Sequence, residues 1–475
     1  MNKVWKSGSA GLLLSAMLVV SACSSNGNEA GSASPSASPS APSAGETGSA
    51  VPSAAPLKGK INLVMWHQPT IDAVNAEIEN YKKLHSEVDI EIIFSAFDQY
   101  YTTIQTQLIG GGAPVGIGVS PETTQMLAKY LEPLTPYFEE ENPYTKQPWK
   151  QDYVANAFEI GKSGTNDVWM VGVAGAVNTG VWYNKKMLDE AGVAVPTTWE
   201  ELMAAQKTIK DSGQIAWSEQ LVANFKGDWY NWQLNYGFNL DDWMKLDTLV
   251  PDGRVSQMEV VRGIKTGEID LKSEKVKAMF AEWKKWVEAG WPENFSSDWG
   301  WYDAFVSGKA AFFLGGSWDT PGFVQNIKDF EYGHFSLPNP GNPSDPIDMA
   351  NLGGAWGLNK GATPEQKAIF IDFMRFLSQP DVHKRVVEAQ GMLPVVQGVE
   401  LSDPVMNAWA QDAKFNVSKI QAISLDNELA SKFLSYSQAF LTGGDLDGFV
   451  DKYASIYQEA AERLITQNKW DTTQW

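Results

Sequence analysis

The feature that most constrains this chain is a regular alternation of short apolar runs with amphipathic segments. An apolar run covers residues 60–67, a helical pattern follows over 71–81, and a second apolar run covers 88–94. Another helical pattern over 101–108 leads, past three glycines, to a weaker apolar run at 115–119. Continuous apolar runs are typical of strands that are covered on both faces. The alternation therefore predicts an α/β fold, with helices packed on a parallel sheet.

The same alternation resumes after residue 179. A strand there is followed by a short helix that we expect to end at Gly192. Thr198 and Glu201 have the spacing of a capping box, which predicts the start of another helix. Two further helices are predicted to begin after Ser273 and after Thr363, from the same kind of start signal.

The N-terminus has the composition of a bacterial secretion signal. Lys3 and Lys6 precede an apolar run over residues 10–20. This run is shorter than the roughly 20 apolar residues that a membrane-spanning helix needs. Small residues and Cys23, the only cysteine in the chain, follow it. We therefore expect residues 1–22 to be a signal peptide that is removed. An ordinary secretory signal, with a cysteine near the cut by chance, is the alternative.

The four residues "VSAC" that end at Cys23 resemble the lipobox of bacterial lipoproteins, in which the cysteine becomes the first mature residue and carries a diacylglycerol thioether. The resemblance implies a protein held by acyl chains such as palmitate at the extracellular face of the cell membrane. Residues 23–57 consist almost entirely of Ser, Ala, Pro, Gly and Asn. Such a segment buries too little apolar surface to fold, so we expect the lipidated cysteine to be followed by a disordered linker.

Length and charge narrow the class of protein further. About 415 residues follow the linker, which is more than one ordinary core holds, so two domains are expected. The chain carries 37 basic and 57 acidic side chains, for a net charge of −20. Because this charge repels nucleic acid, no nucleic-acid partner is expected. Aromatic residues make up 12% of the chain and include 20 Trp, a residue that serves both cores and recognition surfaces.

Several longer stretches resemble one protein family. The most specific is "GVWYNKKMLDEAGVAVPTTWEELMAA", followed by "FVSGKAAFFLGGSWD", "IDFMRFLSQPDVHKRVVEAQGMLPV", "YLEPLTPYF" and "LVMWH". Together these stretches are similar to extracellular solute-binding proteins (family 1, carbohydrate type) of ABC transporters, the family that includes the maltose-binding protein. One departure is Pro114-Val115-Gly116, where the family usually has Pro-Asp.

The resemblance implies a two-lobed periplasmic-binding-protein-like fold (type 2) with a hinge and an interlobe cleft. Lobe 1 would comprise residues 58–177 plus 352–400, and lobe 2 residues 178–351 plus 401–475. A monomer would capture a carbohydrate in the cleft and deliver it to the transmembrane subunits of an ABC permease. Residues 225–270 are longer than is usual in the family, and no role is predicted for them.

Sugars present apolar C–H faces and edges crowded with hydroxyls, so a sugar site needs aromatic platforms with acids and amides around them. We expect such residues in strand-to-helix loops and not in periodic helices. The candidate ligand-binding residues are Trp66, His67, Glu122, Asn178, Asp228, Trp229, Trp232, Trp299, Trp318, Asp319 and Trp356. A place in the core or on a solvated flank is the alternative for each of them.

These candidates rest on different arguments. Trp66 and His67 follow the first strand, where ligands gather at the carboxyl end of a parallel sheet. Trp318 and Asp319 follow a glycine pair, which lets backbone approach a ligand. The positions of Asp228, Trp229 and Glu122 are instead implied by the family resemblance. Three further residues belong to the aromatic and acidic cluster of Trp299, namely Asp298, Trp301 and Asp303, and Trp182 lies on the strand after Asn178. Trp199, Trp283 and Trp286 are predicted to be structural.

Patterns for catalysis and metal binding are mostly absent from the sequence. There is no HExxH, no GxSxG and no cysteine nucleophile, and "GKSGT" lacks the upstream glycine of a P-loop. We therefore expect a binding protein with no enzymatic activity, metal or cofactor. An extracellular glycoside hydrolase remains the rival, because Asp298, Asp303 and Asp319 could supply the two carboxylates that such an enzyme needs. A third alternative keeps the fold but binds an acidic oligosaccharide, against which the small number of Arg residues argues weakly.

Overall fold

The fold belongs to the unit Pro56–Trp475. The computed structural model describes residues 56–120, 124, 127–154, 157, 161–162, 167–173, 175–249, 251, 253–347, 350–412, 419–420, 423, 425–473 and 475. Two of the predicted functional residues, Cys23 and Glu122, lie outside these described residues. Within them, no helix combines the length and apolar character that crossing a membrane requires.

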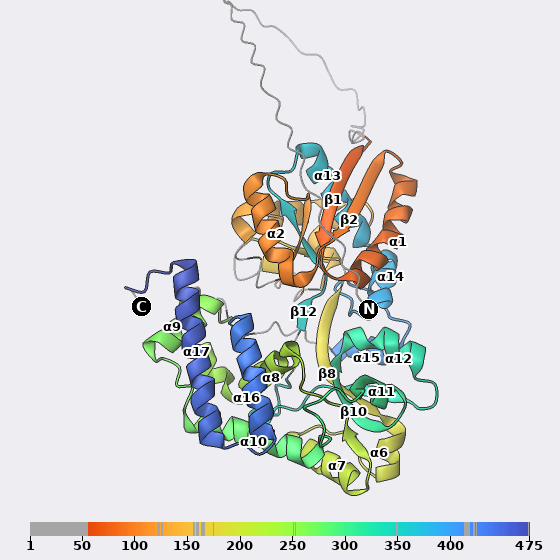
Figure 1. Ribbon diagram of the computed structural model, residues 1–475. Coiled ribbons are helices and arrows are strands. Elements are labelled where there is room, and N and C mark those ends of the chain that lie inside the picture. The colour runs from red at the N-terminus through yellow and green to blue at the C-terminus, as the bar shows by residue number, and fades with distance from the viewer. Residues whose placement is uncertain are drawn as a thin grey trace, which may run out of the picture. The chain divides into compact units, whose positions relative to one another are not determined.

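The first sheet is built mostly from the start of the described chain (Figure 1). Its strands are β1 (Gly59–Met65), β2 (Val88–Phe94), β3 (Gly116–Val119), β4 (Leu131–Glu132), β7 (Val171–Gly172) and β13 (Ala355–Asn359). They run in the order β2-β1-β3-β13-β4, with β7 beside β13. Since β1 pairs in parallel with β2 and β3, the predicted parallel arrangement of these three strands is confirmed. The antiparallel strand β13 returns to this sheet from far along the sequence.

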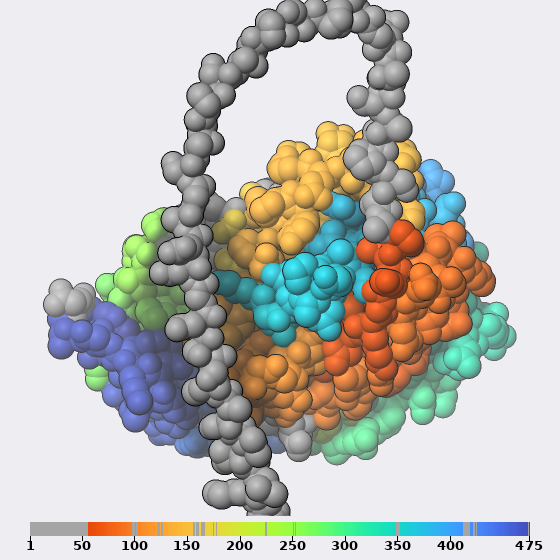
Figure 2. Space-filling view, turned by 90° about the horizontal axis from the view of Figure 1, so that it is seen from above, coloured from red at the N-terminus to blue at the C-terminus, as the bar shows by residue number. Residues whose placement is uncertain are grey.

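Helices cover the first sheet and tie it to later parts of the chain. They are α1 (Gln68–Leu84), α2 (Phe97–Gly110), η1 (Ala128–Tyr130), α4 (Thr135–Glu139), η2 (Trp149–Asp152), α13 (Pro364–Leu377) and α14 (Pro380–Gln390), and β5 (Glu141–Asn142) pairs with β6 (Gln147–Pro148) in a small hairpin. Tyr81 of α1 lies 5.1 Å, ring centre to ring centre, from Phe373 of α13. Figure 2 shows α13 in cyan beside the red and orange segments of the chain, which include β1 and β2.

The second sheet is centred on a long strand. Its strands are β8 (Ala176–Asn184), β9 (Ile215–Trp217), β10 (Ala310–Gly316), β11 (Tyr332–Phe335) and β12 (Ala350–Leu352). Their order is β11-β8-β10-β9, and β12 pairs with the first residues of β8. At Ala176 three distant segments meet, because this residue pairs with Leu352 and also bridges to Leu393.

Among the described residues, eleven helices belong with the second sheet, and two of them begin at start signals that the sequence predicts. They are α6 (Lys185–Ala191), α7 (Trp199–Asp211), α8 (Asn224–Met244), α9 (Gln257–Thr266), α10 (Glu274–Gly290), α11 (Trp301–Val306), η3 (Ser317–Asp319), α12 (Thr320–Asn326), α15 (Pro404–Asp412), α16 (Asn427–Leu441) and α17 (Leu446–Asn468). The capping box of Thr198 and Glu201 is confirmed, and Ser273 caps α10 as predicted. Thr363 also caps α13 through a complete capping box.

Two hydrophobic clusters form the core. Strand β10 contributes to both, because Phe313 points into the cluster around the first sheet while Phe312 and Leu314 point into the cluster under α8 and α10. This is the alternation of side chains expected along a strand. The second cluster also contains Trp199, Trp283 and Trp286, which confirms the prediction that these three tryptophans are structural.

Candidate functional site

An exposed tryptophan lies where β10 ends. Trp318, on η3, keeps 36% of its surface exposed, and its ring centre lies 5.9 Å from that of Trp229 with 49° between the planes. Gly316 makes this arrangement possible, since a Cβ atom there would lie 2.3 Å from the Trp318 ring. The two rings form an angled surface at the end of the sheet, which we call the tryptophan pair (Trp229 and Trp318).

A buried cation lies beside the tryptophan pair. The Nζ atom of Lys226, on α8, lies 4.7 Å from the ring centre of Trp229 and 4.6 Å from that of Trp301. Its side chain is only 1% exposed and forms an ion pair with Glu219, at 3.1 Å. Cation–π attraction is strongest where water is excluded. Lys226 therefore helps to fix Trp229 and Trp301 relative to each other.

Glu219 connects four parts of the chain beneath this surface. Its carboxylate accepts hydrogen bonds from the Tyr230 hydroxyl at 2.7 Å and from the Leu314 N–H at 3.2 Å, besides pairing with Lys226. Its backbone carbonyl accepts from the indole N–H of Trp299 at 2.9 Å. Burial raises the pKa of the Glu219 carboxyl, whereas Lys226 and the hydrogen bonds act in the opposite direction. Glu219 and Lys226 were not predicted as site residues.

Trp301 helps to hold the neighbouring side chains of the site in place. Its ring stacks on Phe313, with 5.0 Å between ring centres and 8° between planes, and Lys226 lies over the ring. With the Gln220 amide turned to satisfy both neighbours, its oxygen accepts from the Trp301 N–H at 2.5 Å and its nitrogen donates to Asp298 at 3.1 Å. These contacts occupy both the Trp301 ring and its N–H. Trp301 therefore serves mainly to position the neighbouring side chains and less to contact a ligand.

The carboxyl of Asp319 lies next to Trp318. Its Oδ2 accepts a hydrogen bond from the Gly316 N–H at 2.9 Å. Burial raises the pKa of Asp319 to about 7, and the Gly316 N–H and Lys226 limit the rise. Near neutral pH such a carboxyl is partly protonated. It can donate a hydrogen bond to a ligand hydroxyl when protonated and accept one when ionised. Asp319 thus places a carboxyl at the same strand end as the tryptophan pair.

An exposed pair of angled aromatic rings at the end of a strand, in a two-sheet α/β chain, agrees with the sequence motifs. Residues 67–384 match the family described as bacterial extracellular solute-binding protein. The chain belongs to this family. The resemblance on which the sequence interpretation rests is therefore confirmed.

This solute-binding protein has relatives of known structure. Raffinose-bound RafE, a protein of Streptococcus pneumoniae, superimposes with a TM-score of 0.62 at 17% identity over 85% of this chain and 100% of that chain. Maltose-bound MalE3 of T. maritima gives a TM-score of 0.62 at 17% identity, over 84% of this chain and 99% of that one. At such identities the likeness concerns the fold, and it confirms the two-lobed periplasmic-binding-protein-like architecture.

The match to a curated relative covers a smaller part of the chain. The multiple sugar-binding protein of Streptococcus mutans serotype c is 23% identical over 244 residues, which are 50% of this chain and 52% of the relative. The match therefore spans about half the length of that protein.

In this solute-binding protein, Trp66 and His67 lie at the end of β1, in the first sheet. Trp66 is half-buried and packs edge-on against Tyr100, with 4.9 Å between ring centres. His67 Nδ1 lies 2.8 Å from the Thr70 hydroxyl, and burial lowers the pKa of its imidazole. Trp66 and His67 belong to the first sheet, whereas the tryptophan pair belongs to the second. Their role as ligand contacts therefore stays a prediction.

Three predicted contacts turn out to be interior side chains. Trp356 is fully buried and donates its N–H to the Val64 carbonyl at 3.1 Å. Trp232 is buried and donates to the Ile420 carbonyl at 3.2 Å. Asn178 is buried as well, and its amide oxygen accepts from the adjacent backbone N–H. We therefore leave these three residues out of the proposed site, and also Trp182, whose N–H donates to the Gly316 carbonyl.

We expected ligand-facing aromatic residues in loops, whereas some of the candidate residues lie in α8. Asp228 and Trp229 are half-buried, but they lie inside this 21-residue helix. Trp299 lies in the segment before α11, as expected, and Trp301 is the first residue of that helix.

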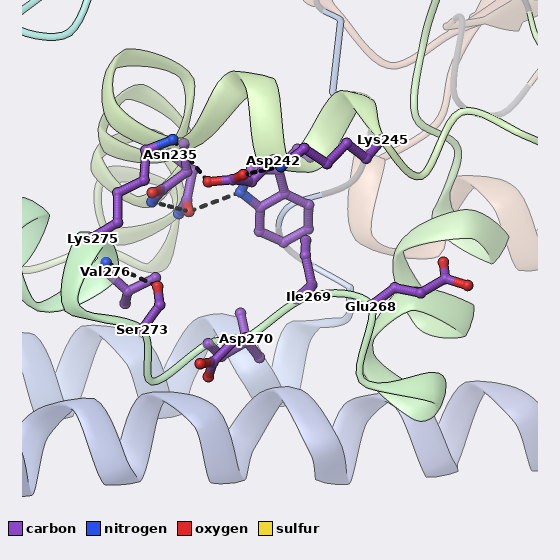
Figure 3. Close-up of a pocket in the computed structure, with 12 residues that line it drawn as sticks. Asn235, Asp242, Lys245, Glu268, Ile269, Asp270, Ser273, Lys275 and Val276 are labelled. Atoms are coloured by element: carbon purple, nitrogen blue, oxygen red, sulfur yellow. Dashed lines mark hydrogen bonds and ion pairs between the residues drawn. The ribbon is translucent and has the colours of Figure 1, made fainter.

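A cavity of about 230 Å³ lies farther along α8, between this helix and the start of α10 (Figure 3). Both of its lysines pair with one carboxylate, because Asp242 contacts Lys245 at 2.6 Å and Lys275 at 2.7 Å. At its base, the Asn235 amide oxygen accepts from the Trp243 N–H at 3.1 Å. Because both lysines and the Asn235 amide oxygen already have partners, this cavity is a weaker candidate than the tryptophan pair.

Proposed function

We propose that this solute-binding protein captures a sugar or oligosaccharide between its lobes and delivers it to the transmembrane subunits of an ABC importer. The observation that carries the proposal is the exposed ring of Trp318, set at an angle to Trp229 and beside the Asp319 carboxyl. The apolar face of a pyranose packs on such rings, and its hydroxyls need polar partners at the rim. Sugar-bound relatives of the same fold support this ligand class.

Capture would proceed by closure of the two lobes. We propose the lobe boundaries given by the resemblance, with residues 58–177 plus 352–400 in one lobe and residues 178–351 plus 401–475 in the other. A ligand on the tryptophan pair that also reaches Trp66 and His67 would contact both lobes. Such a ligand stabilises the closed state by its differential affinity for that state.

The charges of the site favour a neutral sugar over an acidic one. Lys226 is the cation beside the tryptophan pair, and it is buried and already paired with Glu219. The Asp319 carboxyl lies at the same strand end, and it would repel a nearby uronate when ionised. An acidic oligosaccharide would therefore meet no unpaired positive charge among the described residues of this surface.

The positions of two candidate carboxylates argue against a glycoside hydrolase. Hydrolysis needs two carboxyl groups that face each other across the sugar. Asp298 instead contacts the Gln220 amide, and Asp303 is exposed in the first turn of α11. We propose a binding protein without turnover, and release of labelled sugar from oligosaccharides by the purified protein would contradict this.

We further propose that the protein works as a monomer on the outer surface of the cell, held there by lipid on Cys23. The lipobox resemblance of "VSAC" supports this proposal. A Cys23→Ala variant should leave the membrane fraction and appear in the medium. Mass spectrometry of the membrane-bound protein should find a diacylated N-terminal cysteine, and an unmodified cysteine would contradict the proposal.

A thermal-shift screen tests the binding function. The soluble fragment from residue 58 onward is heated with glucose, maltose, maltotriose, raffinose and chitotriose, and with galacturonate oligomers as the acidic set. A ligand that binds only the folded state raises Tm. We expect a neutral sugar to raise Tm, and Trp318→Ala to abolish the shift.

Leu84→Ala serves as the control, because Leu84 is another exposed large apolar residue and lies at the end of α1 that is farther along the chain from Trp66 and His67. The control should keep the full shift in Tm. A folded protein that responds to none of the neutral sugars would contradict the proposed ligand class.

A further inference from the structure

Gln233 is a buried residue of α8 whose side chain lacks partners. It is 1% exposed, and neither its amide nitrogen nor its amide oxygen has a hydrogen-bond partner among the described residues. The indole N–H of Trp229 is in the same condition. Buried polar groups are nearly always hydrogen-bonded, so an unpaired one needs an explanation.

Other buried glutamines of this protein show what a satisfied amide looks like. Gln206, on α7, is 0% exposed, donates to the Trp286 carbonyl at 3.3 Å and accepts from the Trp217 N–H at 2.5 Å. Gln390, on α14, donates to the Val386 carbonyl at 2.9 Å and accepts from the Thr70 hydroxyl. Gln233 departs from this pattern at both of its amide atoms.

Helix geometry places Gln233 next to the proposed sugar surface. Residues four apart lie on one face of a helix, so Trp229, Gln233 and Gly237 form a row along α8. At the far end of this row the chain is tightly packed, since a Cβ atom at Gly237 would lie 2.7 Å from Ile347. Gln233 therefore lies in this row between Trp229 and the packed end at Gly237.

We propose that the Gln233 amide, together with the Trp229 N–H, binds a pair of neutral hydroxyl groups of the ligand and so determines which sugar is accepted. A carboxamide both donates and accepts, and adjacent hydroxyls of a sugar do the same. A carboxylate ligand only accepts, and it would leave the amide oxygen unpaired. This inference rests on the proposed sugar-binding function, and it adds a polar subsite to the aromatic one.

A matched pair of substitutions tests the inference. Gln233→Met and Gln206→Met each replace a buried glutamine with an apolar side chain of similar length. Gln206→Met removes the acceptor of the Trp217 N–H, so it should lower Tm and leave sugar affinity within twofold of the parent. Gln233→Met removes two unpaired groups, so it should hold or raise Tm. It should also weaken binding of the best neutral sugar of the screen by about tenfold or more.

The possible results separate the two proposals. If the parent protein binds maltose, maltotriose, raffinose or chitotriose and Gln233→Met binds it equally well, the inference about Gln233 is wrong while the sugar function stands. If Gln233→Met lowers Tm as Gln206→Met does, the amide is paired within the folded protein, by water or by protein, and its role is structural. If the parent binds no sugar, the proposed function itself fails.

Discussion

Lys226 and Glu219 are the two residues on which the candidate site depends most. Their ion pair is almost fully desolvated, with 1% and 0% of the side chains exposed. Removal of one member of a buried pair leaves an uncompensated charge, which typically costs about 3–5 kcal/mol. We expect Lys226→Met to lower the free energy of unfolding by about that amount, as measured by urea denaturation.

The double variant Glu219→Gln/Lys226→Met is the control for this prediction. It removes both charges, so most of the lost stability should return. A Lys226→Met protein as stable as the parent would mean that Glu219 takes up a proton without cost when its partner is absent.

Asp319 gives the protein a specific dependence on pH. Its pKa in the folded state is raised from the ordinary 3.8 to about 7, so the folded protein holds this proton more tightly than the unfolded chain does. Its contribution to stability is therefore present at low pH and is lost as pH rises from about 4 to about 7. Tm measured across this range should fall less steeply for Asp319→Asn than for the parent. Parallel curves for the two proteins would contradict the raised pKa.

The residues of the site differ in how well the sequence predicts them. Trp318 and Asp319 follow a visible signal, a glycine pair at the end of a strand. Glu219, Lys226 and Gln233 carry no such signal. A buried ion pair seven residues apart looks the same in sequence as two solvated charges, and an unpaired glutamine is recognised only once its surroundings are known.

Among the elements, α8 shows why a periodic pattern can fail. Residues 230–237 of this helix are all buried, because it is covered on several sides by α10, α16, α17 and the second sheet. A helix that is buried on all sides, with polar as well as apolar residues inside, has no apolar stripe of period 3.6 to detect. The strands β1 and β2 and the capped helices α7 and α13 carry local signals instead, and for them the sequence prediction was confirmed.

The turn from β10 into η3 can be tested as an element. A Cβ atom on Gly316 would lie 2.3 Å from the Trp318 ring, so Gly316→Ala should displace that ring while the strand remains intact. We expect sugar affinity to fall about as far as in Trp318→Ala, measured by titration calorimetry. Gly110→Ala is the control, since a Cβ atom there meets nothing within 4 Å. Unchanged affinity in Gly316→Ala would mean that Trp318 does not contact the ligand from this position.

At the scale of the whole molecule, three distant segments meet at Ala176, where Leu352 pairs and Leu393 bridges. If these segments form the hinge of the proposed closure, ligand should change the dimensions of the protein. We expect saturating sugar to lower the radius of gyration measured by small-angle X-ray scattering, and Trp318→Ala to remain unchanged. An identical radius for the parent with and without bound sugar would contradict closure.

The global architecture was predictable in outline and not in its long-range connections. Alternating strands and helices predict a parallel sheet, and the family motifs imply two lobes. The pairing of β13 with β3 joins residues that are more than 200 positions apart in the sequence. No local sequence pattern predicts such a pairing.

The exposure of Trp318 also has an optical consequence. Among the described tryptophans it is the exposed one, at 36%, while eight tryptophans of the core, Trp182, Trp217, Trp283 and Trp356 among them, are shielded from solvent. A neutral quencher such as acrylamide should therefore act first on the emission of Trp318. A ligand that covers this ring would protect it, so the protein carries an intrinsic fluorescent reporter of its own occupancy.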